Sequence, residues 1–242
     1  MRFPAGSVLI RHPTLGDILF DTGYGPAFFD ATRPFPERLY RWLTPVQQPP
    51  DQRLPALLEK HGARPGLILL SHLHADHVAG LFDIPPAPVI TSRKAWEHLQ
   101  EGNRLTTLKA GCPERLRQRI QSLHPQFIED FPVAPDALGT GLPFPFYDLA
   151  ADGSLLAVSL PGHGHGQFGL LLPQTSTGPA FLIADAAWSR QALRDRAPPP
   201  DITLRRLGDA GACHATFAAL CDLAQQRPDI SLWPSHCPEA FA

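Results

Sequence analysis

Long apolar runs are missing from this chain of 242 residues, and so are runs of positive charge. The longest apolar stretches, such as residues 66–70 and 168–173, have only the length of a β-strand and cannot cross a membrane. Lysine occurs only at Lys60, Lys94 and Lys109, and the net charge is -2. We therefore expect no attraction to nucleic acid or to acidic membrane surfaces. No fixed-period repeat is visible, which argues against a repeat architecture.

Cysteine is sparse, and its spacing matches no zinc finger and no C-x-x-C redox pair. The four residues are Cys112, Cys213, Cys221 and Cys237. We favour reduced thiols, as in a cytoplasmic protein. The N-terminal residues MRFPAGSVLIRHP lack the apolar core of a signal peptide, so a cytoplasmic location is expected by default. A strand-like run begins almost at once, which leaves open whether a further N-terminal strand precedes it.

Apolar patterning predicts an α/β fold. Strands are expected at residues 8–11, 17–21, 67–70, 89–91, 144–149, 155–160, 168–172, 180–184 and 230–233. Helices are expected at residues 53–62, 92–100, 113–123 and 212–225, with Ser92 capping the second of them. This order suits helices that cover two mixed β-sheets. Nothing in it suggests a linker, so we predict a single domain over residues 1–242.

Residues 24–51 form a segment rich in proline and aromatic side chains. It does not fit a regular element throughout. Two interpretations stay open: an extended loop that packs on the core, or an aromatic cover over a pocket or a dimer contact. The second would place Phe28 and Phe29 in a substrate pocket, and it leaves a homodimer open.

The strongest chemical signal directly follows the predicted strand 67–70. It is the run Ser71-His72-Leu73-His74-Ala75-Asp76-His77. Alternate residues of an extended chain point the same way, so His72 and His74 can face one metal ion. Asp76 and His77 can serve a neighbouring ion where the loop turns. Imidazole and carboxylate are usual ligands for zinc and related ions, and such a cluster would be costly to bury without one.

Three further candidate ligands each follow a predicted strand: His163 in a Pro-Gly-His turn, Asp185, and His236. Functional sites of layered α/β folds collect at strand ends. Taken alone, each has an ordinary interpretation as a turn, capping or buried structural residue. In combination with the first run, they predict one metal site.

These residues make the sequence resemble the metallo-β-lactamase superfamily, from Phe20-Asp21-Thr22-Gly23 to Ser235-His236. The superfamily's His-x-His-x-Asp-His motif corresponds to His72 through His77 without a departure. The resemblance implies a four-layer αβ/βα sandwich, in which helices flank two mixed β-sheets and the site lies at one edge.

The resemblance also implies two divalent metal ions with seven ligands. These are His72, His74 and His163 on one ion, Asp76, His77 and His236 on the other, and Asp185 bridging both. Asp21 would orient a ligand, as this turn does in relatives. For His165, such an orienting role and a plain structural role are equally open. Zinc is the default, and iron or manganese suits the same donors.

Two such ions can hold a bridging water and lower its pKa towards neutrality, so that the resulting hydroxide attacks an ester, lactone or thioester. Asp76 is then both a ligand and the catalytic proton carrier. No Gly-x-Ser-x-Gly elbow supports a serine nucleophile. Cys237 lacks an independent base, because the adjacent His236 is assigned to a metal. We expect a metal-dependent hydrolase with a small-molecule substrate.

Within the superfamily, the ligand set and the 24–51 segment are most similar to the group of acyl-homoserine lactonases. Those enzymes commonly carry a tyrosine three residues after the bridging aspartate, whereas this chain has Trp188. Indole donates a hydrogen bond but cannot replace a phenol in proton transfer. We expect Trp188 to wall the substrate pocket, which leaves a different ester, lactone or thioester open.

Other functions compete with lactone hydrolysis. A thioesterase of the glyoxalase II type shares all seven ligands. A phosphodiesterase that acts on nucleic acid fits poorly with the charge. A flavodiiron-type redox protein would have glutamate at the position of His74 and a flavodoxin domain. A non-catalytic metal-binding protein is the last alternative.

Overall fold

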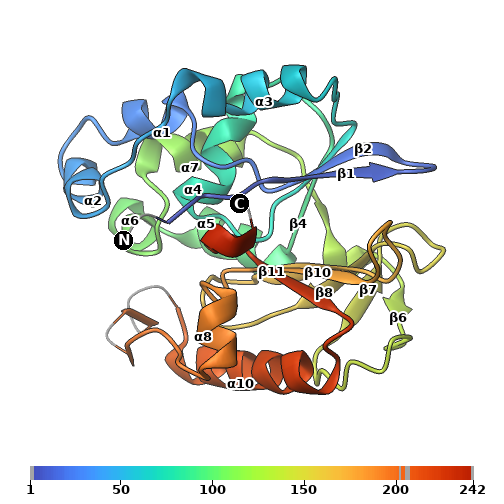
Figure 1. Cartoon of the computed structure of the whole chain (residues 1–242). Coiled ribbons are helices and arrows are strands. Elements are labelled where there is room, and N and C mark those ends of the chain that lie inside the picture. Colours follow the sequence, from blue (N-terminus) through green and yellow to red (C-terminus); the bar gives the residue numbers. More distant parts are fainter. Residues whose placement is uncertain (1–2, 202, 205–207, 241–242) are drawn as a thin grey trace. The chain divides into compact units, whose positions relative to one another are not determined.

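Strands from about the first half of the chain form a five-stranded sheet in the computed structural model, which describes residues 3–201, 203–204 and 208–240 (Figure 1). Its strand order is β1 (Val8–His12), β2 (Gly16–Phe20), β3 (Leu67–Leu69), β4 (Val89–Thr91) and β5 (Gln126–Phe127). The first two strands are antiparallel, and β2, β3 and β4 run parallel. Ile18, Phe20 and Ile68 are buried. Continuously apolar strands of this kind are typical of a parallel sheet that is covered on both faces.

The remaining apolar runs form a six-stranded sheet with the order β11-β10-β9-β8-β7-β6. These strands are β6 (Val133–Ala134), β7 (Phe146–Asp148), β8 (Leu156–Ser159), β9 (Phe168–Leu172), β10 (Ala180–Ala184) and β11 (Ser231–Pro234). Neighbours pair antiparallel except β10 and β11, which are parallel. Strands β8, β10 and β11 therefore all end at the same edge of this sheet.

The chain divides into two compact units. One consists of Ala5–Thr91 and Trp96–Gln126, and we call it the first unit. The second unit consists of Met1–Pro4, Ser92–Ala95 and Phe127–Ala242. Both sheets are mixed and accompanied by helices, which confirms the predicted fold class. The predicted organisation as a single domain stays a prediction.

The helices fall into those before and those after β5. Those before β5 are α1 (Pro26–Ala31), α2 (Glu37–Leu43), α3 (Leu54–Lys60), α4 (Ala75–Val78), α5 (Arg93–Glu101), α6 (Arg104–Lys109) and α7 (Glu114–Gln121), with 3₁₀ turns η1 (Pro50–Gln52) and η2 (Ala79–Asp83). After β5 come η3 (Ile128–Asp130), α8 (Arg190–Arg194), α10 (Ala210–Gln226) and η4 (Pro238–Ala240). Helix α10 lies along the six-stranded sheet (Figure 1), and its Phe217 and Leu220 pack in one core with Phe181 and Ile183 of β10. None of the helices described is both long and apolar enough to span a membrane.

The 24–51 segment contains more regular structure than its sequence suggests, namely α1, α2 and η1. Phe28 is fully buried, and its ring contacts Tyr24, Phe29 and Tyr40. Helix α2 is fastened by Glu37, whose carboxylate accepts two hydrogen bonds from Arg104 at 2.7 and 2.6 Å. This contact joins residues 67 positions apart, so local sequence patterns cannot reveal it.

Arg104→Gln should lower the Tm by about 4–8 °C, because it leaves the buried Glu37 carboxylate without its cationic partner. The Arg104 hydrogen bonds hold the pKa of Glu37 below its usual value. The stabilisation is therefore present above the unfolded-state pKa and is lost as the pH falls through the folded-state pKa. Thermal unfolding should show a large difference between wild type and variant at neutral pH and a small one in acid. Arg194→Gln, which breaks the exposed pair with Glu239, is the control and should change Tm by less than about 2 °C. Equal effects of the two substitutions would contradict the prediction.

Candidate metal centre

In the first unit, two parallel strands deliver polar side chains to the same edge of the sheet. Phe20 at the end of β2 pairs with Leu69 at the end of β3. Asp21 follows the former strand and Ser71 the latter, and the Asp21 amide donates to the Leu69 carbonyl at 2.8 Å. Asp21 has a positive φ of 58°, a conformation that aspartate tolerates better than most residues. The predicted ligands of the His72–His77 run thus lie beside Asp21.

Asp21 is completely buried and accepts three hydrogen bonds. Its Oδ1 accepts from the Ser71 amide at 2.8 Å, and its Oδ2 accepts from the Ser71 hydroxyl at 2.8 Å. Oδ2 also lies 2.8 Å from Nδ1 of His77. Because a carboxylate only accepts, the His77 Nδ1 carries the proton, and the Nε2 of a neutral ring offers a lone pair.

Ser71 sets the tautomer of His72 in the same way. The Ser71 hydroxyl donates its proton to Asp21, so its oxygen accepts a hydrogen bond from the His72 Nδ1 at 3.0 Å. The Nε2 of His72 is then also the nitrogen that can bind a metal. Sequence reasoning missed this role of Ser71, although a hydroxyl residue directly before a ligand histidine is a signal that could have found it.

The other two donors of the run lie close by. The rings of His72 and His74 have centroids 4.3 Å apart, and their ligand nitrogens lie within 4.8 Å of each other. Asp76 Oδ2 lies 3.8 Å from the His77 Nε2. The loop at Gly111 packs against His74: its carbonyl accepts from the Ala75 amide at 3.0 Å, and a Cβ at this glycine would stand 2.9 Å from the imidazole. The structure thus places the four donors of the run together.

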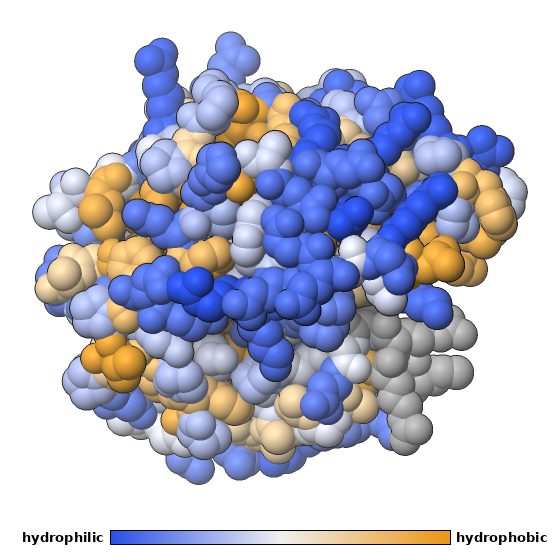
Figure 2. Space-filling view, turned by 180° about the vertical axis from the view of Figure 1, so that it is seen from behind, coloured by the Kyte–Doolittle hydropathy of each residue, from blue (hydrophilic) through white to orange (hydrophobic). Residues whose placement is uncertain are grey.

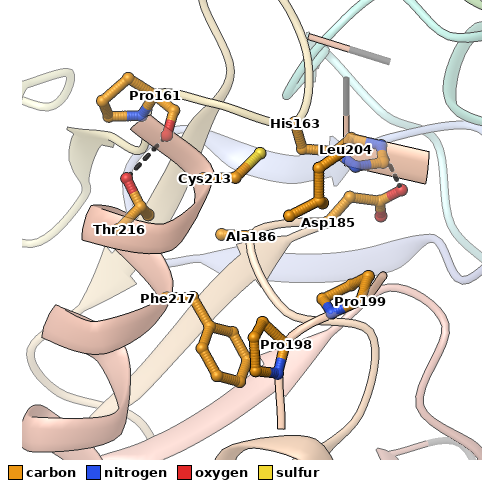
Figure 3. A pocket seen from close by; sticks show the side chains of 10 residues that line it. All are labelled: Pro161, His163, Asp185, Ala186, Pro198, Pro199, Leu204, Cys213, Thr216 and Phe217. Atoms are coloured by element: carbon orange, nitrogen blue, oxygen red, sulfur yellow. Dashed lines mark hydrogen bonds and ion pairs between the residues drawn. The ribbon is translucent and has the colours of Figure 1, made fainter. Parts of the chain in front are cut away.

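In the second unit, strands β8, β10 and β11 bring three predicted ligands to one edge. Asp185 follows β10, and His236 follows the parallel strand β11. The Asp185 Oδ2 lies 2.9 Å from Nε2 of His236. It also lies 3.1 Å from Nε2 of His163 (Figure 3). The sheet topology therefore accounts for the meeting of residues that are far apart in sequence.

The arrangement around Asp185 suits a cation. The Nδ1 of His236 lies 2.6 Å from the Pro4 carbonyl, which only accepts, so this nitrogen carries a proton. In a neutral ring, the Nε2 lone pair then faces the Asp185 oxygen at 2.9 Å. Two acceptors at this distance repel each other, and a metal ion or a proton between them removes the repulsion. The donor chemistry of both units therefore fits metal binding.

A pocket in the second unit adjoins these ligands. It encloses about 290 Å³ of empty space, part of it open to solvent (Figure 3). Its lining consists of Pro161, His163, Asp185, Ala186, Pro198, Pro199, Leu204, Cys213, Thr216 and Phe217. Burial raises the pKa of the Cys213 thiol to about 11, so this group is protonated at neutral pH and is no ready nucleophile. The Thr216 hydroxyl donates to the Pro161 carbonyl at 2.6 Å and fixes the turn that carries His163.

Apart from His163 and Asp185, none of the residues that line the pocket was predicted from the sequence as a site residue. The apolar positions of α10 belong to a helix whose role is otherwise that of core packing. Pro198 and Pro199 lie in a run of three prolines, which is typical of a surface loop. No local pattern distinguishes these side chains from ordinary core and loop residues, so tertiary structure was needed to find them.

Three residues expected at the substrate pocket, namely Trp188, Phe28 and Phe29, are not among those that line the pocket of Figure 3. Trp188 packs its ring against those of His163 and Phe3, with centroids 6.4 and 6.3 Å apart. Its indole Nε1 is buried without a hydrogen-bond partner among the described residues. Phe28 and Phe29 belong to the first unit. His165 is exposed on the turn after His163. The functional roles suggested for these four residues stay predictions.

Comparison with known proteins decides the family. A model of the metallo-beta-lactamase superfamily matches residues 2–176, well over half of the chain. The chain belongs to this superfamily. The predicted resemblance is therefore confirmed. The His72–His77 run of this metallo-β-lactamase superfamily member lies within the residues that the family model matches.

Curated relatives point to one group within the superfamily. The N-acyl homoserine lactonase AttM of Azorhizobium caulinodans is 28% identical over 135 residues, which cover 52% of this chain and 44% of AttM. An N-acyl homoserine lactonase from a Bacillus species is 24% identical over 188 residues, covering 76% of this chain and 64% of that protein. The matched part thus spans less than half of AttM.

Solved structures support the fold. A variant of the B. thuringiensis protein AiiA, with N-decanoyl-L-homoserine bound at its active site, has a TM-score of 0.70 at 18% identity and covers 99% of this chain and 83% of its own. AidC, a dizinc quorum-quenching lactonase, has a TM-score of 0.60 at 20% identity, covering 95% of this chain and 71% of its own. At such low identities, these similarities establish the architecture.

Proposed function

We propose that the protein is a binuclear metal-dependent hydrolase that cleaves a carboxylic ester, with a lactone as the first candidate substrate. The observation that carries the proposal is the tautomer that the hydrogen bonds set in three of its histidines. In His72, His77 and His236, Nδ1 donates a hydrogen bond to an oxygen atom of the protein, so that Nε2 is the nitrogen that can bind a metal. Structural histidines need no such common arrangement.

The proposed ligand sets are those that the superfamily implies. One ion takes His72, His74 and His163, the other takes Asp76, His77 and His236, and Asp185 serves both. Family membership and the donor chemistry of each unit support this assignment. Zinc is the first candidate because AidC is a dizinc lactonase, and iron is the second because TTHA1623 has been solved in a di-iron-bound form.

When bound, two divalent ions lower the pKa of a water molecule and polarise the substrate carbonyl. The residues of the chain do the rest. Asp76, whose side chain is 15% exposed, takes the proton from the attacking water at a carboxylate oxygen. It returns this proton to the alcohol oxygen that leaves when the ester C–O bond breaks. Asp21 and Ser71 hold His77 and His72 in place during these transfers.

The lactonase relatives support an ester or lactone over other bonds. AttM and the Bacillus protein are both named as N-acyl homoserine lactonases. We therefore propose a small lactone or ester as substrate. The indole of Trp188 cannot act as a proton donor in the way of a phenol, so proton transfer is assigned to Asp76 alone.

The test is a substrate panel with metal-loaded protein whose metal content has been measured. It includes lactones with short and long acyl chains, a linear ester, a thioester and a phosphodiester. We expect two metals per chain and a kcat/KM on the order of 10⁴ M⁻¹s⁻¹ or more for a lactone or ester. Removal of the metal with a chelator should abolish turnover, and zinc should restore it. Two bound metals without turnover of any substrate would instead indicate a metal-binding protein. A preference for the thioester or phosphodiester would contradict the proposed substrate class.

A further inference from the structure

Helix α2 presents an apolar face to solvent. Leu39, Trp42 and Leu43 lie three and four positions apart, on one side of the helix, and are 41%, 64% and 78% exposed. The opposite side carries the buried Glu37 and the half-buried Tyr40, whose ring contacts Phe28. The orientation of the helix is therefore fixed by the protein, and the exposed side chains cannot turn inward without breaking these contacts.

Two neighbouring side chains enlarge this surface. Phe35, just before α2, is 72% exposed, and Leu105 on α6 is 58% exposed. Arg104 ties the two elements together, because its guanidinium donates to the Phe35 carbonyl at 2.7 Å and to Glu37. We call Phe35, Leu39, Trp42, Leu43 and Leu105 the α2 surface. Figure 2 shows an apolar cluster with strongly hydrophilic neighbours at its right edge, the side on which α2 lies in that view.

A small excess of positive charge borders the α2 surface. Residues 30–44 and 101–110 together carry five basic side chains and three acidic ones, although the whole chain has a net charge of -2. Two of the acidic side chains are paired within this region, Asp30 with Arg33 at 3.0 Å and Glu37 with Arg104. Arg38 is exposed one turn before Trp42 on α2, and Lys109 is exposed one turn after Leu105 on α6. From the net charge of -2 we expected no attraction to acidic membranes, but that value averages over the whole chain and conceals the local excess.

We propose that the α2 surface docks on a lipid bilayer that contains anionic phospholipid. Exposed tryptophan and leucine beside arginine is the pattern of helices that lie in the membrane interface. Anionic headgroups complement the basic rim, and the apolar side chains enter the acyl boundary. A second copy of the chain suits the surface less well, because a two-fold interface would place the same basic patch against itself. The inference is independent of the proposed hydrolase activity.

The experiment is co-sedimentation of the full chain with vesicles of phosphatidylcholine, with and without phosphatidylglycerol. We expect binding only to the phosphatidylglycerol vesicles, and release by salt. The double variant R38Q/K109Q should partition roughly 10–30-fold more weakly, as expected for two lost basic side chains. The double variant W42S/L43S should lose binding to a similar extent. Both variants should keep the wild-type Tm, because they alter exposed positions.

Val133→Ser is the matched control, since Val133 on β6 is 74% exposed but lies outside the α2 surface. It should bind vesicles as wild type does. Wild-type protein that fails to bind at low salt, or that binds both vesicle types equally, would overturn the proposal. Variants that bind as strongly as wild type would do the same. A wild-type dimer in sedimentation velocity that W42S/L43S dissociates, without vesicle binding, would assign the surface to a second copy instead.

Discussion

Asp185→Asn should reduce turnover of the preferred substrate by roughly 10³-fold or more, while the protein stays folded. The carboxylate oxygen of Asp185 lies within hydrogen-bonding distance of Nε2 on both His236 and His163. An asparagine has nearly the same shape but no negative charge. It would bring either a weaker oxygen or an NH₂ group to the place where a cation is proposed. The substitution therefore removes the proposed bridging ligand without removing the packing.

The measurement combines turnover with metal content and thermal unfolding. We expect fewer than two metals per chain and an unchanged or slightly altered Tm. His74→Ala should have the same effect on turnover, because it removes a donor of the set that also contains His72 and His163. Asp195→Asn is the control, since it makes the same chemical change at an exposed position on the same unit. Near-normal activity of Asp185→Asn with both metals bound would refute the assigned site.

The sequence predicted the strands well where apolar runs are short and bounded by turn residues. Phe168–Leu172 and Ala180–Ala184 have the expected boundaries, and so has Val89–Thr91. Burial on both faces produces such runs, so the pattern and the structure have one cause. The predicted cap at Ser92 is confirmed, because its hydroxyl accepts from the Ala95 amide at 3.1 Å.

Helices that depend on tertiary contacts escaped the sequence analysis. Helix α2 begins within a proline-rich run, and its position depends on the contact between Glu37 and Arg104. Helix α6 was also missed, although Asn103 and Thr106 form a capping box at its start. Its few residues carry too short an apolar pattern to be recognised as a helix. Short helices of this kind are found from their contacts and caps rather than from periodicity.

The candidate site was predictable where its residues are close in sequence or directly follow a strand. Four donors occur within six residues, so local spacing alone reveals the His72–His77 run. His163, Asp185 and His236 could be proposed because each follows a strand, and the family resemblance then selected them. The pocket lined by Thr216 and Phe217 had no such signal, since it arises where α10 meets the turns after β8 and β10.

Asp21 connects the fold to the proposed chemistry more directly than any other residue that is not itself a ligand. Through Oδ2 it fixes the proton of His77 on Nδ1, and through the Ser71 hydroxyl it does the same for His72. One buried carboxylate thus sets which nitrogen two proposed ligands offer to a metal. The strand pairing of β2 with β3 places it there.

Asp21→Asn should therefore weaken metal binding about 10–100-fold, although asparagine tolerates the positive φ and fills the same space. Its carbonyl can still accept from the Ser71 amide, but its NH₂ group then faces the Ser71 hydroxyl and Nδ1 of His77. Such a donor favours the tautomer that has its proton on Nε2, which cannot bind a metal. Stability should fall by only about 1–3 kcal/mol, the cost of buried hydrogen bonds that are made poorly.

Competition with a chromogenic chelator measures the affinity, and urea unfolding of the metal-free protein measures the stability. Asp17→Asn, on the same strand but half-buried at its start, where the carboxylate accepts from the Arg64 amide, is the matched control and should leave metal affinity unchanged. Wild-type affinity in Asp21→Asn would mean that the tautomers of His72 and His77 are set by other contacts.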